Sequence, residues 1–487
     1  MKKVLCLLLA MLMTLSLAAA VAEETAQEPA KVRTIVTADW LDDDQCSLIR
    51  YLLYSNEFET AGIIADKTAP GDYPIAGSTY ELGGKTVENR DIAQYFIDVY
   101  AEDYENLLLH DPDYPDPEYL TSINVNGSIN NNDMEPSEGS ELIKACILDD
   151  REDMLFIQCW GGTGTLAAAL KSIEDEYKDT DEWEAIQQKV YDKVVVWHDL
   201  GQDSCYDTYI IPNWPNLYSI MSYSQFGAMV MFMDVNIPND QVKYYAGEWV
   251  AEYIANDNSA LSRAYYEIKG DHKATTTERV GYPDPQAAIV EGDTPNFFYI
   301  LDNGLRQLED PSYGGWGGRF AKASRDVFMI TRGGNFTNFW VDTDDDGDIY
   351  KPIYRWTEDF QNEFAARMEW TYASYEEANH EPVVTLDEGI DFTAQRGETI
   401  TLTAQTSDPD GDAVTVSFWQ YGDADTYGGD VELIPGEGDQ ISFVVPEDAK
   451  IGDTIHIIVE AQDDYELPIT RYQRAIVTVV DAEAEAE

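Results

Sequence analysis

Patterns of buried strands alternate with helical patterns over most of the chain, and this alternation restricts the fold more than any other feature. Each candidate strand is a short run of β-branched and other apolar residues, and each candidate helix has helical apolar spacing. Over residues 32–375 the alternation predicts an α/β domain whose mostly parallel sheet is flanked by helices. Ligands usually bind such sheets at the carboxyl ends of the strands. The predicted strands are residues 33–38, 60–65, 153–160 and 193–198, and the predicted helices are residues 46–54, 92–104, 140–148 and 163–172.

The pattern changes beyond about residue 375. Several short strands follow one another with turn-rich stretches between them and no helical window. This arrangement predicts an all-β sandwich of immunoglobulin or cadherin type over residues 380–481. An acidic tail, residues 482–487, alternates Ala and Glu and is expected to fray. The predicted strands of the sandwich are residues 383–386, 399–405, 414–420, 440–445, 454–461 and 471–480.

The first residues predict export. Residues 1–22 combine a basic start, one apolar run and a small-residue cleavage site near Ala22, which is typical of a secretory signal peptide. Residues 23–31 are expected to form a polar leader. No second run of about 20 apolar residues follows, so we expect a secreted or cell-envelope protein that is not inserted in a membrane. The four later cysteines have no CxxC spacing, and we expect them to be buried free thiols.

Composition excludes some partners. Asp and Glu number 92 against 31 Lys and Arg, and the formal net charge is −61. A general nucleic-acid binder is excluded because phosphate contacts need basic side chains. Docking on anionic lipid is disfavoured for the same reason.

An acidic turn directly after the first predicted strand is the first candidate site. Asp39, Asp42, Asp43 and Asp44 place four carboxylates within six residues. Oxygen ligands without His or Cys favour a hard cation, Ca²⁺ before Mg²⁺. The alternative is helix capping, in which one or two Asp accept backbone hydrogen bonds at a helix start. Four carboxylates exceed what capping needs, so we predict a metal site here.

Several segments in the same order resemble one family. The acidic turn is similar to the Asp-rich loop of nucleoside hydrolases. The longer context resembles secreted bacterial nucleoside hydrolase-like proteins, whose founding member is described as cellulose-binding, with their associated β domain. The resemblance covers nearly all of residues 31–480 and implies a nucleoside hydrolase-like fold. Its segments are residues 43–45, 50–58, 160–170, 291–297, 314–319, 360–367, 454–460 and 470–474.

The resemblance implies roles for individual residues. Asp39 would be the catalytic base and a Ca²⁺ ligand, and the other ligands would be Asp44, Asp293 and the carbonyl of Trp160. Asp43 and Glu291 would bind sugar hydroxyls. The residues alone leave simpler interpretations open: Trp160 precedes a Gly-rich strand-to-helix turn, and Asp293 precedes a helix start. Trp316 lies in a Gly-rich loop that is either flexible or presents an aromatic ring to a sugar beside the pocket.

The chain also departs from nucleoside hydrolases. Thr37 stands where they usually have the first Asp of the turn, and Gly292 stands where many carry the His that helps the base to leave. The metal-binding and water-activating part of the machinery is retained in the sequence, whereas the leaving-group part is not. Two further acidic loops, residues 342–348 and 408–412, are either Ca²⁺ sites or acidic turns.

The leading hypothesis is a secreted hydrolase of the nucleoside hydrolase superfamily that cleaves an N-glycosyl-type bond with a Ca²⁺-activated water. The alternative is a carbohydrate-binding protein without turnover. The expected partners are a carbohydrate or ribosyl-containing small molecule, or cellulose or another polysaccharide. Because nucleoside hydrolases are often dimers or tetramers, the resemblance also makes a homo-oligomer a prediction.

Overall fold

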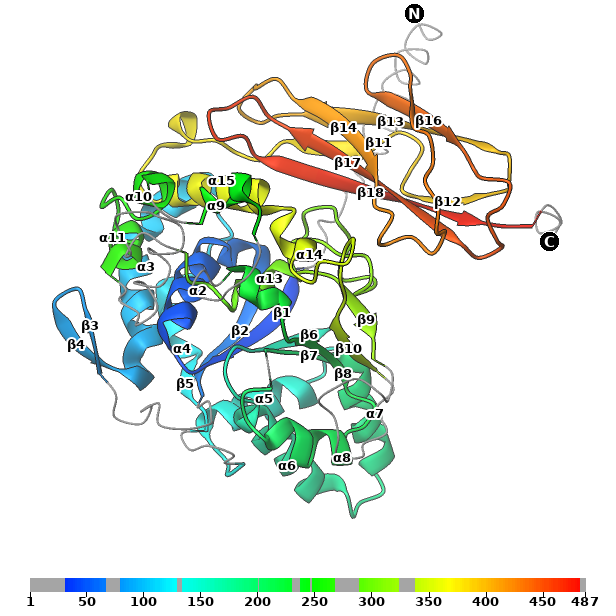
Figure 1. Ribbon diagram of the computed structural model, residues 1–487. Helices are drawn as coiled ribbons and strands as arrows, with labels where there is room; N and C mark the ends of the chain where they lie inside the picture. The colour runs from blue at the N-terminus through cyan, green and yellow to red at the C-terminus, as the bar shows by residue number, and fades with distance from the viewer. Residues whose placement is uncertain are drawn as a thin grey trace, which may run out of the picture. The chain divides into compact units, whose positions relative to one another are not determined.

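A computed structural model describes the chain from Lys31 to Asp481 with gaps (Figure 1). The predicted signal peptide, most of the leader and the acidic tail lie outside the described residues. From Val32 onward the chain forms one compact unit. No helix in the described part is long and apolar enough to cross a membrane. The described residues are 31–66, 79–128, 134–199, 201–229, 237–245, 248–267, 289–323 and 338–481.

An eight-stranded sheet organises the α/β domain. Its strand order is β5-β2-β1-β6-β7-β8-β10-β9, and every neighbouring pair is parallel except β10 and β9. All four strands predicted from the sequence are present, which confirms the mostly parallel α/β prediction. The strands are β1 (Val32–Ala38), β2 (Phe58–Ala65), β5 (Asn124–Asn126), β6 (Leu155–Cys159), β7 (Val194–Asp199), β8 (Tyr218–Ser222), β9 (Phe320–Lys322) and β10 (Phe339–Asp342).

Helices bury both faces of this sheet. Successive residues of a strand point to opposite faces, and in β1 Ile35 joins one apolar cluster while Val36 joins the other. The cluster around Val36 also holds residues of α2, α3, α13 and α15, and the cluster around Ile35 holds residues of α5, α6 and α8. The α-helices are α2 (Asp42–Leu53), α3 (Ile92–His110), α4 (Pro117–Ser122), α5 (Glu138–Leu148), α6 (Gly164–Tyr177), α7 (Trp183–Lys193), α8 (Ile211–Asn213), α9 (Asn239–Val242), α10 (Glu248–Tyr253), α11 (Ala260–Glu267), α13 (Thr294–Phe298), α14 (Lys351–Tyr354) and α15 (Thr357–Glu369).

The C-terminal region forms two four-stranded sheets that enclose a separate apolar core. One sheet has the order β11-β13-β16-β15 and the other β12-β18-β17-β14; all pairs are antiparallel except β12 with β18. Buried and exposed residues alternate along β11 as they do in a half-buried strand. A β-sandwich is therefore confirmed. Its strands are β11 (Val383–Leu386), β12 (Asp391–Ala394), β13 (Thr399–Ser407), β14 (Thr415–Gln420), β15 (Ile434–Pro435), β16 (Gln440–Val444), β17 (Thr454–Gln462) and β18 (Thr470–Val479), and a separate hairpin joins β3 (Thr79–Leu82) to β4 (Lys85–Glu88).

Helix α15 contacts the β-sandwich directly. Asp359 accepts hydrogen bonds from Thr470 Oγ1 at 2.9 Å and Tyr472 Oη at 2.5 Å. Glu363, which is 1% exposed, pairs with Arg471 of β18 at 2.5 Å. Ten of the thirteen residues of α15 are buried. The helix thus packs between the α/β core and the sandwich.

The cysteines agree with the sequence prediction. Cys46, Cys146, Cys159 and Cys205 are buried and form no disulfide. Burial raises the pKa of the Cys146 thiol, which keeps it protonated at neutral pH.

Candidate metal centre

Asp39 lies at the carboxyl end of β1, one residue beyond the strand. It is 1% exposed, and its Oδ1 accepts a hydrogen bond from the backbone N–H of Leu41 at 3.4 Å. The next residue, Trp40, has a φ of +57°, a left-handed conformation that is uncommon for a bulky side chain. Such backbone strain persists where the surrounding structure imposes it, and it concentrates at functional sites. Here it turns the chain sharply from β1 into α2.

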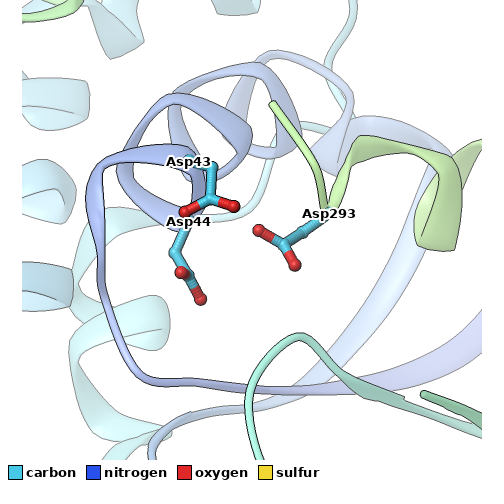
Figure 2. A group of neighbouring side chains, drawn as sticks. All are labelled: Asp43, Asp44 and Asp293. Carbon is cyan, nitrogen blue, oxygen red and sulfur yellow. The ribbon is translucent and has the colours of Figure 1, made fainter. Parts of the chain in front are cut away.

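Three further carboxylates meet above this turn (Figure 2). Asp43 and Asp44 lie in the first turn of α2, and Asp293 is the residue that precedes α13. Each contributes one oxygen to a group in which all oxygens lie within 4.8 Å of one another. Figure 2 shows Asp293 pointing toward the two carboxylates of α2 from a separate segment of the chain. The side chain of Asp42 lies outside the described residues.

Burial and mutual repulsion both act on these carboxyl groups. The pKa of Asp44 is raised well above its usual value, first by burial and then by the charges of Asp39, Asp293 and Asp43. The pKa of Asp293 is raised likewise, first by burial and then by Asp43, Asp199 and Asp39. The cluster therefore holds its negative charge at a high cost in free energy unless protons or a cation neutralise it.

Two oxygens of the cluster have no hydrogen-bond partner among the described residues. Asp44 Oδ2 accepts a hydrogen bond from the N–H of Leu41 at 3.2 Å, but Asp44 Oδ1 has no hydrogen-bond partner among the described residues. Asp293 Oδ2 has none in that part of the chain either. Buried polar atoms are nearly always hydrogen-bonded, so each such exception calls for an explanation. A set of converging carboxylate oxygens with unused lone pairs fits a hard divalent cation such as Ca²⁺.

Trp160 follows β6, the strand next to β1, so its main chain lies at the same edge of the sheet. Its N–H donates to the carbonyl of Thr37 at 2.8 Å, and its own carbonyl accepts from Gln202 Nε2 at 2.7 Å. A carbonyl has two lone pairs, so this contact leaves one for a cation. The Trp160 ring packs edge-to-face on Trp40 and Tyr51 in the apolar core.

Glu291 faces the interior of the protein. It is fully buried and forms an ion pair with Arg50, whose Nε lies 2.6 Å from Glu291 Oε2. Its oxygens also accept hydrogen bonds from Tyr265 Oη at 2.5 Å and Thr294 Oγ1 at 2.9 Å. The prediction that Glu291 binds sugar hydroxyls is wrong for this structure, because the protein itself occupies both oxygens.

Trp316 is likewise placed differently from the prediction. The ring is fully buried, packs edge-to-face on Phe298 and Phe360, and donates from Nε1 to Tyr472 Oη at 3.3 Å. Because Tyr472 belongs to β18, Trp316 belongs to the contact between the α/β core and the sandwich. It cannot stack on a sugar in this position.

Sequence reasoning missed two polar residues beside the cluster. Asp199, the last residue of β7, is 2% exposed and accepts hydrogen bonds from Asn296 Nδ2 at 2.7 Å and Trp197 Nε1 at 3.1 Å. Asn296 also donates to the carbonyl of Asp293 at 2.9 Å. Burial, with smaller contributions from Asp342 and Asp43, raises the pKa of Asp199 to about 8. Asp199 could have been found by the signal that was used for Asp39, which is an Asp at the end of an apolar strand.

The acidic loop of residues 342–348 is a centre of ion pairs. Asp345 is fully buried between Arg319 Nε at 2.6 Å and Arg355 Nη1 at 2.8 Å, and it accepts from Tyr421 Oη at 2.8 Å. Asp342 Oδ2 accepts from the backbone N–H groups of residues 223–225. Cationic side chains of the protein thus neutralise the buried carboxylate of this loop.

The acidic loop of residues 408–412 is a tight turn. Asp408 Oδ1 accepts the N–H groups of residues 410–412 at 2.8–3.1 Å, and Gly411 takes a φ of +87°. Asp408, Asp410 and Asp412 each bring one oxygen within 4.8 Å of the others. Asp410 is also bound by the N–H of His380 at 2.7 Å and its Nδ1 at 2.9 Å. The turn geometry accounts for most of its acidic residues, and Ca²⁺ binding there stays a prediction.

Comparisons with known proteins agree with this architecture. Residues 33–320 match the family described as cellulose-binding Sde182, nucleoside hydrolase-like domain, and residues 399–479 match the family described as cellulose-binding protein Sde0182, C-terminal domain. No curated protein matches the chain.

Among solved structures, one is similar over nearly the whole chain. It is a nucleoside hydrolase-related hypothetical protein from Saccharophagus degradans that is associated with carbohydrate metabolism. The two chains are 27% identical with a TM-score of 0.70, and the match covers 92% of this chain and 100% of the other. The titin M3 domain matches 20% of this chain and 97% of its own length at 17% identity, but its TM-score of 0.15 is too low to bear on the fold.

Proposed function

We propose a hydrolytic function for this chain, which belongs to the cellulose-binding Sde182 family through its nucleoside hydrolase-like domain. The proposed reaction is hydrolysis of a glycosyl bond of N-glycosyl type. One observation carries the proposal: Asp43 and Asp44 of α2 and Asp293 before α13 converge at the carboxyl edge of the sheet beside Asp39, and two of their buried oxygens have no partner among the described residues. Ligands of open α/β sheets bind outside the carboxyl ends of the strands, which is this edge.

The residues of the cluster have separate roles in this proposal. Asp39, Asp44, Asp293 and the Trp160 carbonyl would hold Ca²⁺, and Asp43 would bind sugar hydroxyls. A bound Ca²⁺ would offset the repulsion among the carboxylates and polarise oxygen atoms near it. Asp39 accepts a proton from the attacking water as the oxygen of that water bonds to the anomeric carbon. The bond from that carbon to the leaving atom then breaks, and the leaving atom keeps its electron pair.

The leaving group sets the expected substrate class. Gly292 provides no side chain at the position where many nucleoside hydrolases carry a proton-donating His. We therefore expect substrates whose leaving group departs with little acid assistance. The negative charge of the carboxylates stabilises the positive charge that develops on the sugar ring in the transition state.

Binding of a polysaccharide without turnover is the second candidate function. It is supported by the cellulose-binding description of both matched families and by the association of the Saccharophagus degradans relative with carbohydrate metabolism. Such a role also suits the secreted location that the first 22 residues predict.

The deciding experiment compares the wild type with Asp39→Asn and with Asp302→Asn, an exposed carboxylate outside the cluster. Ca²⁺ binding is measured by titration calorimetry, and release of reducing sugar is assayed on a panel of nucleosides and oligosaccharides. We expect Ca²⁺ binding and sugar release in the wild type and the control. Asp39→Asn should lose nearly all of the rate while it keeps the fold.

The other outcomes separate the two candidates. Ca²⁺ binding with no release, together with saturable affinity for a polysaccharide, would replace the hydrolase with the binding protein. Equal Ca²⁺ binding and equal rates in the wild type and Asp39→Asn would refute the site proposed here.

A further inference from the structure

We propose that Arg50 and Glu291 are positioning residues that hold Asp293 in place against Asp43 and Asp44. The inference rests on the proposed function in one respect, since it takes the cluster to bind a cation. The three carboxylates come from two segments that are far apart in sequence, α2 and the turn at residues 291–294. Something must fix one segment relative to the other, because the carboxylates that they bring together repel one another.

The ion pair bridges those two segments. Arg50 follows Asp44 by six residues on α2, and Glu291 precedes Asp293 by two residues. Arg50 Nε lies 2.6 Å from Glu291 Oε2, and Arg50 Nη2 donates to Glu291 Oε1 at 3.3 Å. Both side chains are 0% exposed. A buried pair of this kind is held firmly, because breaking it would leave an uncompensated charge in the interior.

Glu291 is further restrained from its own side. Tyr265 of α11 donates to Oε1 at 2.5 Å, and Thr294 donates to Oε2 at 2.9 Å. The N–H of Glu291 donates to the carbonyl of Met229 at 2.9 Å, and the N–H of Thr294 donates to the carbonyl of Glu291 at 3.3 Å. The main chain on both sides of Asp293 is therefore anchored through Glu291.

Arg50 is restrained by α15. Its Nη2 donates to Gln361 Oε1 at 2.5 Å and its Nη1 to the carbonyl of Phe360 at 3.4 Å. The guanidinium lies 3.7 Å from the centroid of the Phe364 ring, within the range of a cation–π contact. The planar fork of Arg makes these contacts at once, which a Lys ammonium cannot do. The contacts with α15 thus fix the position of Arg50 independently of its ion pair with Glu291.

This arrangement counters the repulsion within the cluster. The charges of Asp43 and Asp39 repel the carboxylate of Asp293. An unrestrained turn would lower this repulsion by moving Asp293 away from them. The ion pair between Glu291 and Arg50 opposes that movement, so the carboxylate oxygens of the cluster stay close enough to bind one cation. Groups that orient metal ligands change metal affinity by about 10–100-fold when they are mutated.

The test uses Tb³⁺, which takes oxygen ligands like Ca²⁺ and reports its bound waters through its luminescence lifetime. The full chain is compared with Glu291→Gln, Arg50→Lys and Tyr265→Phe. The matched control is Glu363→Gln, which removes a carboxylate that is 1% exposed and pairs with Arg367 at 3.0 Å. Urea unfolding of each metal-free variant measures its loss of stability.

We expect Glu291→Gln to weaken Tb³⁺ binding at least about tenfold and to shorten its lifetime, because a displaced Asp293 lets an extra water bind the ion. Arg50→Lys should have the same effect in part, and Tyr265→Phe should have a smaller one. Glu363→Gln should lose stability while its Tb³⁺ affinity and lifetime stay those of the wild type.

Three results would overturn the inference or its premise. Wild-type affinity and lifetime in Glu291→Gln would refute the positioning role. If Glu291→Gln does not fold, wild-type values in both Arg50→Lys and Tyr265→Phe would refute it. A wild type that binds neither Tb³⁺ nor Ca²⁺ would instead refute the cation site of the proposed function, and the inference would fall with it.

Discussion

Removal of one charge from the buried cluster should stabilise the metal-free protein. Asp293→Asn keeps the shape of the side chain and a residue type suited to a helix start, but it deletes one carboxylate. One carboxylate oxygen from each of Asp43, Asp44 and Asp293 lies within 4.8 Å of the other two. Two unit charges at that distance repel by about 3 kcal/mol at an effective dielectric constant of about 20. The variant should therefore gain up to about 3 kcal/mol in a chelating buffer, and the gain should grow as pH rises to 8.

The metal-free protein should become less stable as pH rises. The pKa values of Asp44 and Asp293 are raised in the folded protein, mainly by burial. Between pH 4 and those raised values the folded state binds more protons than the unfolded state. The free energy of unfolding of the metal-free wild type thus falls as pH rises, and the slope should be smaller in Asp293→Asn.

Thermal unfolding in the presence and absence of Ca²⁺ measures both effects. For a unit of this length, about 3 kcal/mol corresponds to a rise of about 3 °C in the melting temperature. Saturating Ca²⁺ should raise the melting temperature of the wild type, because the ion binds only the folded protein, and should have little effect on Asp293→Asn. Asp302→Asn, an exposed control, should behave as the wild type. A metal-free Asp293→Asn that is less stable than the wild type at pH 8, or that Ca²⁺ stabilises equally, would refute this reasoning.

Three further predictions concern buried side chains outside the proposed ligand set. Burial raises the pKa of Asp199 to about 8, so the free energy of unfolding of the metal-free wild type should fall as pH rises from about 4 to 8. Urea unfolding should show a smaller slope of stability against pH in Asp199→Asn. An unchanged slope would contradict this prediction. Burial lowers the pKa of His198 to about 3, so the free energy of unfolding should fall as pH drops below about 6.5, by about 2 kcal/mol at pH 5. The variant His198→Phe should abolish that loss. An equal loss in the variant would show that another group is responsible. Trp316→Ala should lower the free energy of unfolding by about 3–5 kcal/mol in denaturant unfolding, because the ring is fully buried in the core. The affinity for saccharides should stay unchanged. A selective loss of saccharide affinity would restore the predicted stacking role.

The strands of the sheet could be predicted because their signal is local. The run of residues 194–197 is apolar on both faces, which is typical of a buried parallel strand. Asp39 could be predicted for a related reason, since a carboxylate at the end of such a strand must lie at the edge where ligands bind. Asp44 and Asp293, two of the ligands that the family resemblance implied, meet there, and the third carboxylate of the group is Asp43.

The roles of Glu291 and Trp316 could not be predicted, because they depend on partners that are distant in sequence. Glu291 and Asp293 stand two residues apart in one turn, and nothing in the turn tells which of them faces the cluster. The answer comes from Arg50, 241 residues away, which pairs with Glu291. Trp316 is buried by Tyr472 of the sandwich, 156 residues further along the chain. A Gly-rich loop with one aromatic ring has the same sequence whether or not a second domain covers it.

The contacts of α15 restrict how the length of such chains can change during evolution. One part of the helix, at Asp359 and Glu363, contacts β18, while Gln361 and the carbonyl of Phe360 hold Arg50. An α-helix turns by about 100° per residue, so the insertion or deletion of one residue ahead of this stretch would rotate both sets of contacts out of place together. A substitution here alters the contacts of one residue, whereas a change in length displaces all of these contacts together. We therefore expect insertions and deletions among descendants of this chain to gather in its loops, with the length of α15 left unaltered.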